Sequence, residues 1–128
     1  MSDTVVNVRY MVDDVPTAAD WYVGHLGFQR LPNASPAFAA VEKGPLRLLL
    51  SGKGSSAGRP MPDGVQPAPG GWNRFQVIVE DLSAEVERLR GEGVKFRNDI
   101  ITGPGGSQIL AEDPAGNIVE LFQPANWF

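Results

Sequence analysis

The chain has 128 residues, no cysteine and a formal net charge of −4 at pH 7. Hydrophobic residues make up 42% and charged residues 20% of it, which is typical of one globular domain that can bury a core. The acidic balance argues against nucleic-acid binding, and the missing cysteines exclude disulfides and thiolate-based metal sites. No basic segment followed by an apolar one opens the chain, and no apolar run approaches about 18 residues, so we expect a cytoplasmic protein without a membrane partner.

The first predicted elements are a strand and then a helix within "NVRYMVDDVPTAADWYVGHLG", which starts at Asn7. Apolar residues first alternate with polar ones and then recur every three or four positions, which indicates a half-buried strand followed by an amphipathic helix. Asp14 suits the N-cap of this helix, and Gly24 suits its end. Three strand-like pieces follow, "GFQRL", "AFAAVEKG" and "LRLLLSG", so module one, about residues 5–52, is predicted to be β-α-β-β-β.

Residues 53–71 are rich in Gly, Ser and Pro and have no apolar period, which predicts a linker. The chain then repeats itself, because the residues from Arg74 match those from Asn7 at a constant distance of 67 positions. Module two, about residues 72–124, is therefore predicted to be β-α-β-β-β as well, with Asp81 and Gly91 at the ends of its helix. Residues 125–128 form a C-terminal tail. The predicted fold class is α+β, with two repeated modules in a single domain.

Burial and exposure can be predicted from the same repeat. The apolar positions of the two first strands are predicted to lie in the core: Tyr10, Val12, Phe75, Val77 and Val79. The single histidine, His25, lies near the end of the first helix and is predicted to be a solvated surface group, which makes it a poor metal ligand or general base.

Two such modules, with the segments "VRYMVDDVPTAADWYVGHLGF" and "EDPAGNIVELFQP", resemble the vicinal-oxygen-chelate superfamily, which includes glyoxalase I, extradiol dioxygenases and bleomycin-resistance proteins. The resemblance extends from Asn7 to Pro124, and in character it is nearest to the metal-free drug-binding resistance proteins. It implies a curved mixed sheet around a cleft, a small organic ligand, and a homodimer with clefts at its interface. The superfamily hosts unrelated chemistries on one scaffold, so function has to be inferred from the site residues.

Enzymes of this superfamily hold a divalent metal on inward-facing side chains of the first and last strands of each module. Carried over, the resemblance places Asn7, Leu49, Arg74 and Glu120 at these positions, with an error of one residue possible at Leu49. One carboxylate with an amide, an alkyl group and a guanidinium is a poor ligand set for such metals. We therefore expect no metal and no other cofactor, and we expect Arg74 to replace the metal as the partner of Glu120.

The same alternation predicts a cleft lining that combines aromatic surface with a few polar groups, as pockets for organic ligands do. The predicted ligand-binding residues are Asn7, Arg9, Met11, Phe38, Arg47, Leu49, Trp72, Arg74, Gln76, Glu120 and Phe122. Trp127 is near enough in sequence to add stacking surface. Several arginines in this set disfavour a cationic ligand and favour a neutral polycyclic or an anionic one.

Three functions remain open at this point. The first is a metal-free binding protein that has no catalytic residues and sequesters an aromatic antibiotic or a related natural product. The second is a glyoxalase-like lyase or isomerase, or a dioxygenase, with a degenerate or non-standard active site in which Glu120 serves as a base. The third is a scaffold or interaction module in which Arg74 and Glu120 form only a structural ion pair.

Overall fold

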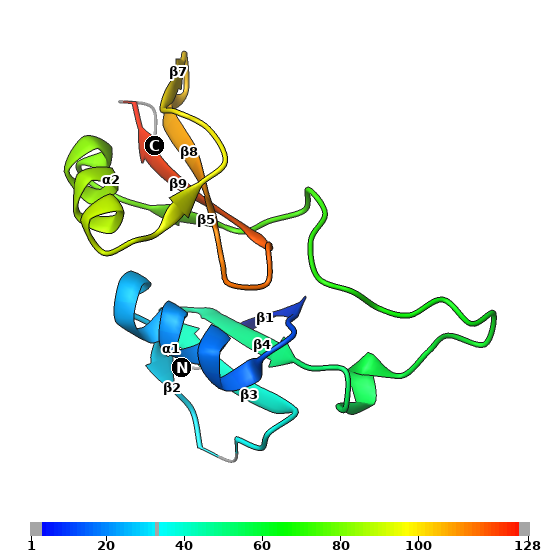
Figure 1. The fold of residues 1–128 in the computed structure, drawn as a ribbon. Coiled ribbons are helices and arrows are strands. Elements are labelled where there is room, and N and C mark those ends of the chain that lie inside the picture. The colour runs from blue at the N-terminus through cyan, green and yellow to red at the C-terminus, as the bar shows by residue number, and fades with distance from the viewer. Residues whose placement is uncertain (1–3, 33, 126–128) are drawn as a thin grey trace. The chain divides into compact units, whose positions relative to one another are not determined.

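The chain folds into two compact units, of which the first ends at Gly70 and the second begins at Gly71 (Figure 1). The structure, a computed structural model, describes residues 4–32 and 34–125. Trp127 and the rest of the predicted tail beyond Ala125 lie outside these residues. Each unit consists of one long helix and one mixed sheet, so the α+β class and the two repeated modules predicted from the sequence are confirmed.

The first unit has the predicted β-α-β-β-β order. Its elements are β1 (Val6–Met11), α1 (Val15–Leu26), β2 (Gln29–Arg30), β3 (Phe38–Lys43) and β4 (Leu46–Ser51), and a short 3-10 helix, η1 (Ser56–Gly58), follows. The strand order in the sheet is β1-β4-β3-β2. Strand β1 runs parallel to β4, whereas the other neighbours are antiparallel, so among the described strands of this sheet β1 lies at the edge and pairs with β4.

The second unit repeats this arrangement with one additional short strand. Its elements are β5 (Gln76–Ile78), α2 (Leu82–Gly91), β6 (Lys95–Phe96), β7 (Ile101–Gly103), β8 (Gly106–Glu112) and β9 (Ile118–Pro124). The order is β5-β9-β8-β6, with β7 paired to β8 and β5 parallel to β9. The strand expected at "VKFRNDI" is reduced to two residues, because the Asn98 side chain accepts the Leu110 N–H at 3.0 Å and replaces the backbone ladder there.

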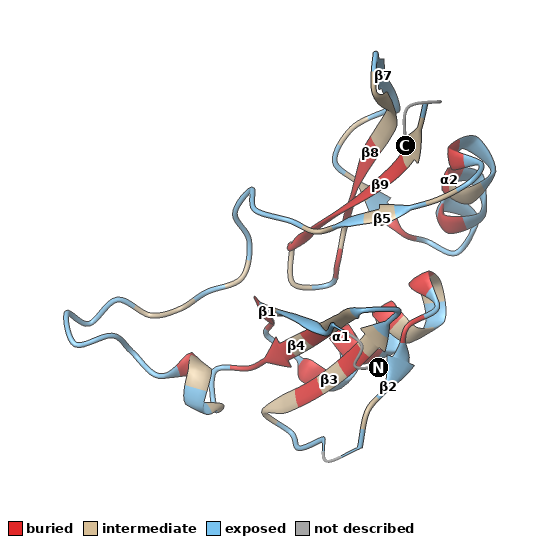
Figure 2. Cartoon of the chain, turned by 180° about the vertical axis from the view of Figure 1, so that it is seen from behind, coloured by how far each residue is buried: buried red, intermediate tan, exposed pale blue. Residues whose placement is uncertain are grey.

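The core of each unit lies between its helix and one face of its sheet (Figure 2). In the first unit the fully buried side chains include Tyr22 of α1, Val41 of β3, and Leu48 and Leu50 of β4. In the second unit they include Leu89 of α2, Ile109 of β8, and Val119 and Leu121 of β9. Burial alternates along β3, whereas the five successive residues Ile118–Phe122 of β9 are all buried. Side chains alternate between the two faces of a strand, so each sheet also has a face opposite the one that packs on its helix. We call this the helix-free face.

The predicted core residues are buried to different degrees in the two units. Tyr10 and Val12 are buried, at 7% and 3% exposure. Phe75, Val77 and Val79 are only half-buried, because β5 is a three-residue edge strand with a neighbour on one side only.

Both helices begin as predicted. The Asp14 carboxylate accepts the Thr17 N–H, and the Asp81 carboxylate accepts the Ala84 N–H, each at 3.1 Å. The helix end predicted at Gly24 is wrong, because α1 continues to Leu26 and stops at Gly27, where the backbone takes a φ of 72°. No helix in the described ranges is long and apolar enough to cross a membrane.

Candidate functional site

Glu120 is a buried carboxylate in the middle of β9, with 7% of its surface exposed. Arg74 donates from Nε to Oε1 at 2.9 Å, and Gln76 donates from Nε2 to Oε2 at 2.7 Å. The predicted ion pair is therefore confirmed, although it makes one hydrogen bond and not two. Because each oxygen has its own N–H donor, the cost of burying the charge is offset.

Strand pairing brings these side chains together. Strand β5 lies parallel to β9, with Gln76 opposite Glu120 and Ile78 opposite Phe122. Residues two apart on a strand share a face, so these four side chains lie on the helix-free face of the second unit. The alternate residues of β9, Val119 and Leu121, point to the other face of the sheet, toward α2, and are fully buried.

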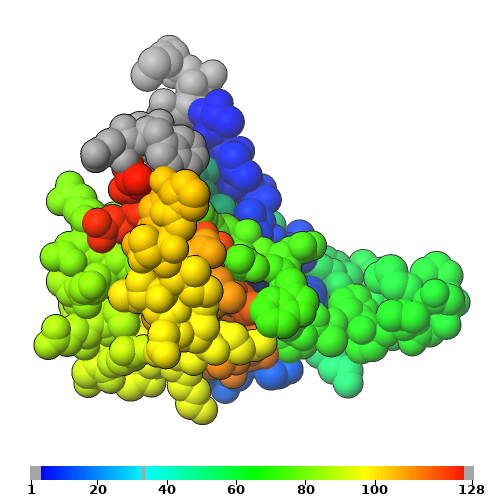
Figure 3. Space-filling model, turned by 90° about the horizontal axis from the view of Figure 1, so that it is seen from above, coloured from blue at the N-terminus to red at the C-terminus, as the bar shows by residue number. Residues whose placement is uncertain are grey.

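An exposed aromatic ring adjoins this cluster. Trp72 is 65% exposed, and its carbonyl oxygen accepts a hydrogen bond from Arg74 Nη1 at 3.2 Å. Arg97 places its guanidinium carbon 5.2 Å from the centre of the Trp72 ring, and its Nη2 also lies 3.3 Å from Glu112 Oε1. Residues around Arg97, yellow in Figure 3, lie at the surface of the second unit. The cation therefore orders an indole ring that remains accessible.

Sequence reasoning missed Arg97. The repeat does match it with Arg30, 67 positions earlier, but that pairing does not indicate that it contacts Trp72.

The predicted ligand-binding residues of the first unit share one face. Asn7 lies opposite Arg47 and Arg9 opposite Leu49, whereas Met11 and Phe38 both lie opposite Ser51. This is the helix-free face, because the alternate residues Leu48 and Leu50 are completely buried. The repeat also supports the placement of Leu49: Arg9 lies opposite Leu49, and its counterpart Gln76 lies opposite Glu120.

Two arginines on this face lack acidic partners. Arg9 donates from Nη1 to the Ser51 hydroxyl at 2.8 Å, and within residues 4–32 and 34–125 it forms no ion pair. Arg47 likewise has no ion pair in these ranges, and its Nε is buried without a hydrogen-bond partner there. The helix-free face of the first unit therefore offers unused hydrogen-bond donors.

Comparison with known proteins identifies the family. Residues 4–121 match the sequence profile of the Glyoxalase/Bleomycin resistance protein/Dioxygenase superfamily. The chain belongs to this superfamily. Among curated proteins, no sequence is similar enough to count as a relative.

Solved structures of the superfamily match nearly the whole chain. A member from Sphaerobacter thermophilus is 26% identical with a TM-score of 0.76, and the match covers 96% of this chain and 98% of that one. TnmS3, an antibiotic binding protein from Streptomyces sp. CB03234, is 26% identical with a TM-score of 0.72, covering 97% and 98%. A lactoylglutathione lyase from Agrobacterium tumefaciens is 20% identical with a TM-score of 0.74, covering 98% and 97%, which shows a shared fold.

The metal that the superfamily fold implies does not fit the residues around Glu120. N–H groups of Arg74 and Gln76 already use one lone pair on each oxygen of the carboxylate, and the Arg74 guanidinium, 2.9 Å from Oε1, would repel a divalent ion there. In the described ranges, no group of three or more His, Asp or Glu side chains gathers around a possible ion. The single histidine, His25, is half-buried and not fully solvated, because its ring packs 5.7 Å from the ring of Trp21 on α1.

The structure brings together only part of the predicted set. Trp72, Arg74, Gln76 and Glu120 form one connected group in the second unit, and Phe122 shares their face. The six residues of the first unit share a face of their own. That the two groups line one cleft, and that they contact a ligand, stay predictions.

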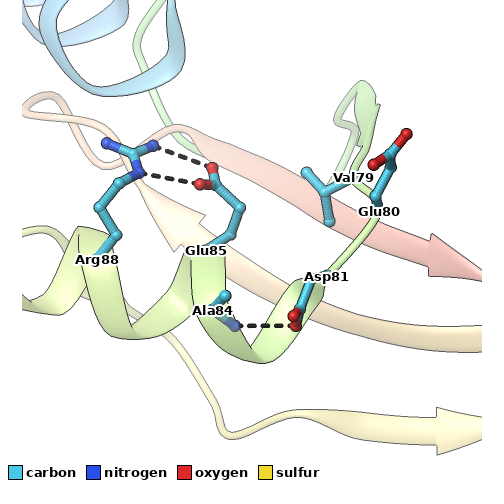
Figure 4. Close-up of a pocket in the computed structure, with 6 residues that line it drawn as sticks. All are labelled: Val79, Glu80, Asp81, Ala84, Glu85 and Arg88. Atoms are coloured by element: carbon cyan, nitrogen blue, oxygen red, sulfur yellow. Dashed lines mark hydrogen bonds and ion pairs between the residues drawn. The ribbon is translucent and has the colours of Figure 1, made fainter.

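A separate hollow of about 480 Å³ lies at the start of α2, between Val79 and Arg88 (Figure 4). Both oxygens of Glu85 accept hydrogen bonds from Arg88, each at 2.9 Å, while Asp81 caps the helix. The hydrogen bonds to Glu85 raise the pKa of Arg88. These charged groups satisfy one another within the helix, so their positions have a structural explanation.

Proposed function

We propose that this protein is a metal-free binding protein that sequesters an aromatic antibiotic or a related natural product. One observation carries the proposal: Arg74 and Gln76 occupy both oxygens of Glu120, the acid at a metal-ligand position of the superfamily. One lone pair on each oxygen is already used, and the positive charge of Arg74 stands where a metal cation would have to approach. This arrangement favours a receptor over a lyase or dioxygenase.

The neighbouring residues support an aromatic ligand. Trp72 presents an exposed ring that Arg97 orders from one side, and flat organic molecules stack on such rings. TnmS3, which is described as an antibiotic binding protein, is 26% identical over nearly the whole chain. The exposed Arg9 side chain binds only the Ser51 hydroxyl among the described residues, and its other N–H donors suit acceptor groups such as phenols, quinones or carboxylates.

Thermal unfolding in the presence of a panel of aromatic antibiotics, and separately of Ni²⁺, Zn²⁺, Mn²⁺ and Fe²⁺, tests this function. We expect at least one antibiotic to raise the melting temperature by several degrees and the metal ions to leave it unchanged, because a ligand that binds only the folded state stabilises it. Stabilisation by a metal ion would instead favour an enzyme. If nothing in either panel shifts the transition, the protein is better explained as an interaction module.

Replacing Trp72 with alanine is expected to weaken binding of the antibiotic found in that panel about fivefold. A stacking contact of this kind contributes about 1 kcal/mol, and the exposed ring contributes little to the fold. Isothermal titration calorimetry measures the change, and Trp72→Phe, which keeps a flat ring, serves as the matched control with most of the affinity retained. Equal affinity of the wild type and Trp72→Ala would show that the Trp72 ring does not contact the antibiotic.

We further propose that the protein works in the cytoplasm as a homodimer, with the ligand clefts at the dimer interface. Exposed apolar residues on the sheet edges support association: Val6 on β1 is 52% exposed, and Ile78 on β5 is 56% exposed. Light scattering after size-exclusion chromatography is expected to give twice the 13.8 kDa mass of the chain, and Val6→Lys to shift the protein toward monomer. A wild-type mass of one chain at micromolar concentration would contradict the dimer.

A further inference from the structure

We infer that the first unit contains a pocket for an anionic group carried on an aromatic body, with Arg9 as the residue that binds the anion. The inference deepens the proposed small-molecule binding and rests on it. It names the chemical class of the ligand, an aromatic carboxylate.

The pocket is a hollow of about 410 Å³. Its lining includes Arg9 of β1, Phe38 at the start of β3, Ser35 and Ala37 just before it, and residues 54–56. All of these belong to the first unit, and none is acidic. The volume lies within the range of about 300–1,000 Å³ that is common for ligand pockets.

Among the described residues of this lining Arg9 is the only charged one, and Ser51 is the one described residue that its side-chain donors bind. One N–H of Nη1 binds the Ser51 hydroxyl at 2.8 Å, which holds the guanidinium in place. By contrast, the Arg30 guanidinium is paired with Asp20 and that of Arg74 with Glu120. A fixed guanidinium with free N–H groups beside a hollow matches the fork geometry of a carboxylate.

The rest of the lining suits an aromatic body. Phe38 and Ala37 supply apolar surface beside Arg9, and three hydroxyl groups, those of Ser35, Ser55 and Ser56, lie around it. Arg9 itself is exposed, so the apolar surface beside it serves to contact the ring of a ligand whose carboxylate binds the guanidinium. The combination therefore favours an anion attached to a flat ring over a small, fully hydrated anion.

The wall formed by residues 52–58 is held by hydrogen bonds within the first unit. Gly52 donates its N–H to the Ala37 carbonyl at 2.8 Å, and the Ser55 hydroxyl donates to the Gly52 carbonyl at 2.7 Å. A Cβ on Gly58 would lie 2.4 Å from the Gly52 carbonyl oxygen, so only glycine lets the chain turn back so closely. A preformed wall lowers the entropy lost when a ligand binds.

A pair of probes tests the inference: 2-naphthoate, and 2-naphthamide as its neutral counterpart. In an NMR titration, we expect the naphthoate to bind at least about tenfold more tightly and to shift the amide signals of Ala37, Phe38 and Ser55. Arg9→Gln should lower the naphthoate affinity about 10- to 100-fold, because a charge-assisted hydrogen bond is lost. Arg9→Lys, which keeps the charge but not the fork, should fall between. Arg30→Gln removes the same charge from the same unit outside the pocket and should leave the affinity unchanged.

Equal affinity for acid and amide in the wild-type protein would overturn the inference, and that comparison requires no variant. So would shifts confined to other residues, or unchanged naphthoate binding by a folded Arg9→Gln protein. The antibiotic panel separates this failure from that of the proposed function. If an antibiotic binds but naphthoate does not, only the anion pocket is wrong; if naphthoate binds at Arg9 and no antibiotic does, antibiotic sequestration is wrong and the pocket stands.

Discussion

Replacing Arg74 with alanine is expected to lower the free energy of unfolding by about 2 kcal/mol. The substitution leaves the Glu120 carboxylate, with 7% of its surface exposed, with only Gln76 as a donor among the contacts described above. A buried charge that loses its counter-charge is left poorly compensated by the groups around it. Urea denaturation measures the free energy, and a thermal scan should show a midpoint roughly 8 °C lower.

Two further variants show whether this loss comes from the buried charge. Arg30→Ala removes a guanidinium from an exposed ion pair, whose partner Asp20 has 72% of its side chain accessible, and should cost less than about 1 kcal/mol. The double change Arg74→Met with Glu120→Gln removes both charges and should recover most of the stability. If Arg74→Ala were as mild as Arg30→Ala, Glu120 would not depend on its ion pair.

The Arg74–Glu120 pair could be predicted because the resemblance to the superfamily implies that both residues stand at metal-ligand positions, and local rules agree with that placement. Alternation along a strand determines which residues share a face, and the repeat indicates which strands correspond. In the structure Gln76 lies opposite Glu120 in the parallel register, and Arg74, two residues before Gln76, reaches the Glu120 carboxylate. The N-caps Asp14 and Asp81 were predictable for a similar reason, since the bond to an amide three residues later is local.

Other features of the site depend on contacts that a single sequence does not specify. Gln76 was expected on the correct face, but not as the second donor to Glu120, which depends on its side-chain conformation. The contact of Arg97 with Trp72 joins two loops whose paths follow from the whole fold. The wall beside Arg9 lies in residues 52–58, where the composition predicted mainly a linker, because turns built on glycine carry no apolar period.

The turn that leads into β9 is expected to be at least as important to stability as the ion pair, so Asp113→Ala should lower the free energy of unfolding by about 3 kcal/mol. Asp113 is 5% exposed. Its Oδ1 accepts the N–H groups of Ala115 and Asn117, each at 2.9 Å, and its Oδ2 accepts Asn117 Nδ2 at 3.1 Å. Gly116 takes a φ of 87° within this turn. Alanine at position 113 removes the acceptor of these three N–H donors at once, and the two that belong to Asn117 are buried.

Asp81 serves as the control, because it is also a carboxylate that accepts a backbone N–H but lies at the surface. Asp81 accepts the Ala84 N–H at 3.1 Å at the exposed start of α2, so Asp81→Ala should cost only about 1 kcal/mol in the same urea experiment. Asp113→Asn, which keeps one acceptor oxygen but not the charge, should fall between the two. Equal losses for Asp113→Ala and Asp81→Ala would mean that the turn tolerates unpaired amides. Strand pairing alone would then hold β9, and with it Glu120, in position.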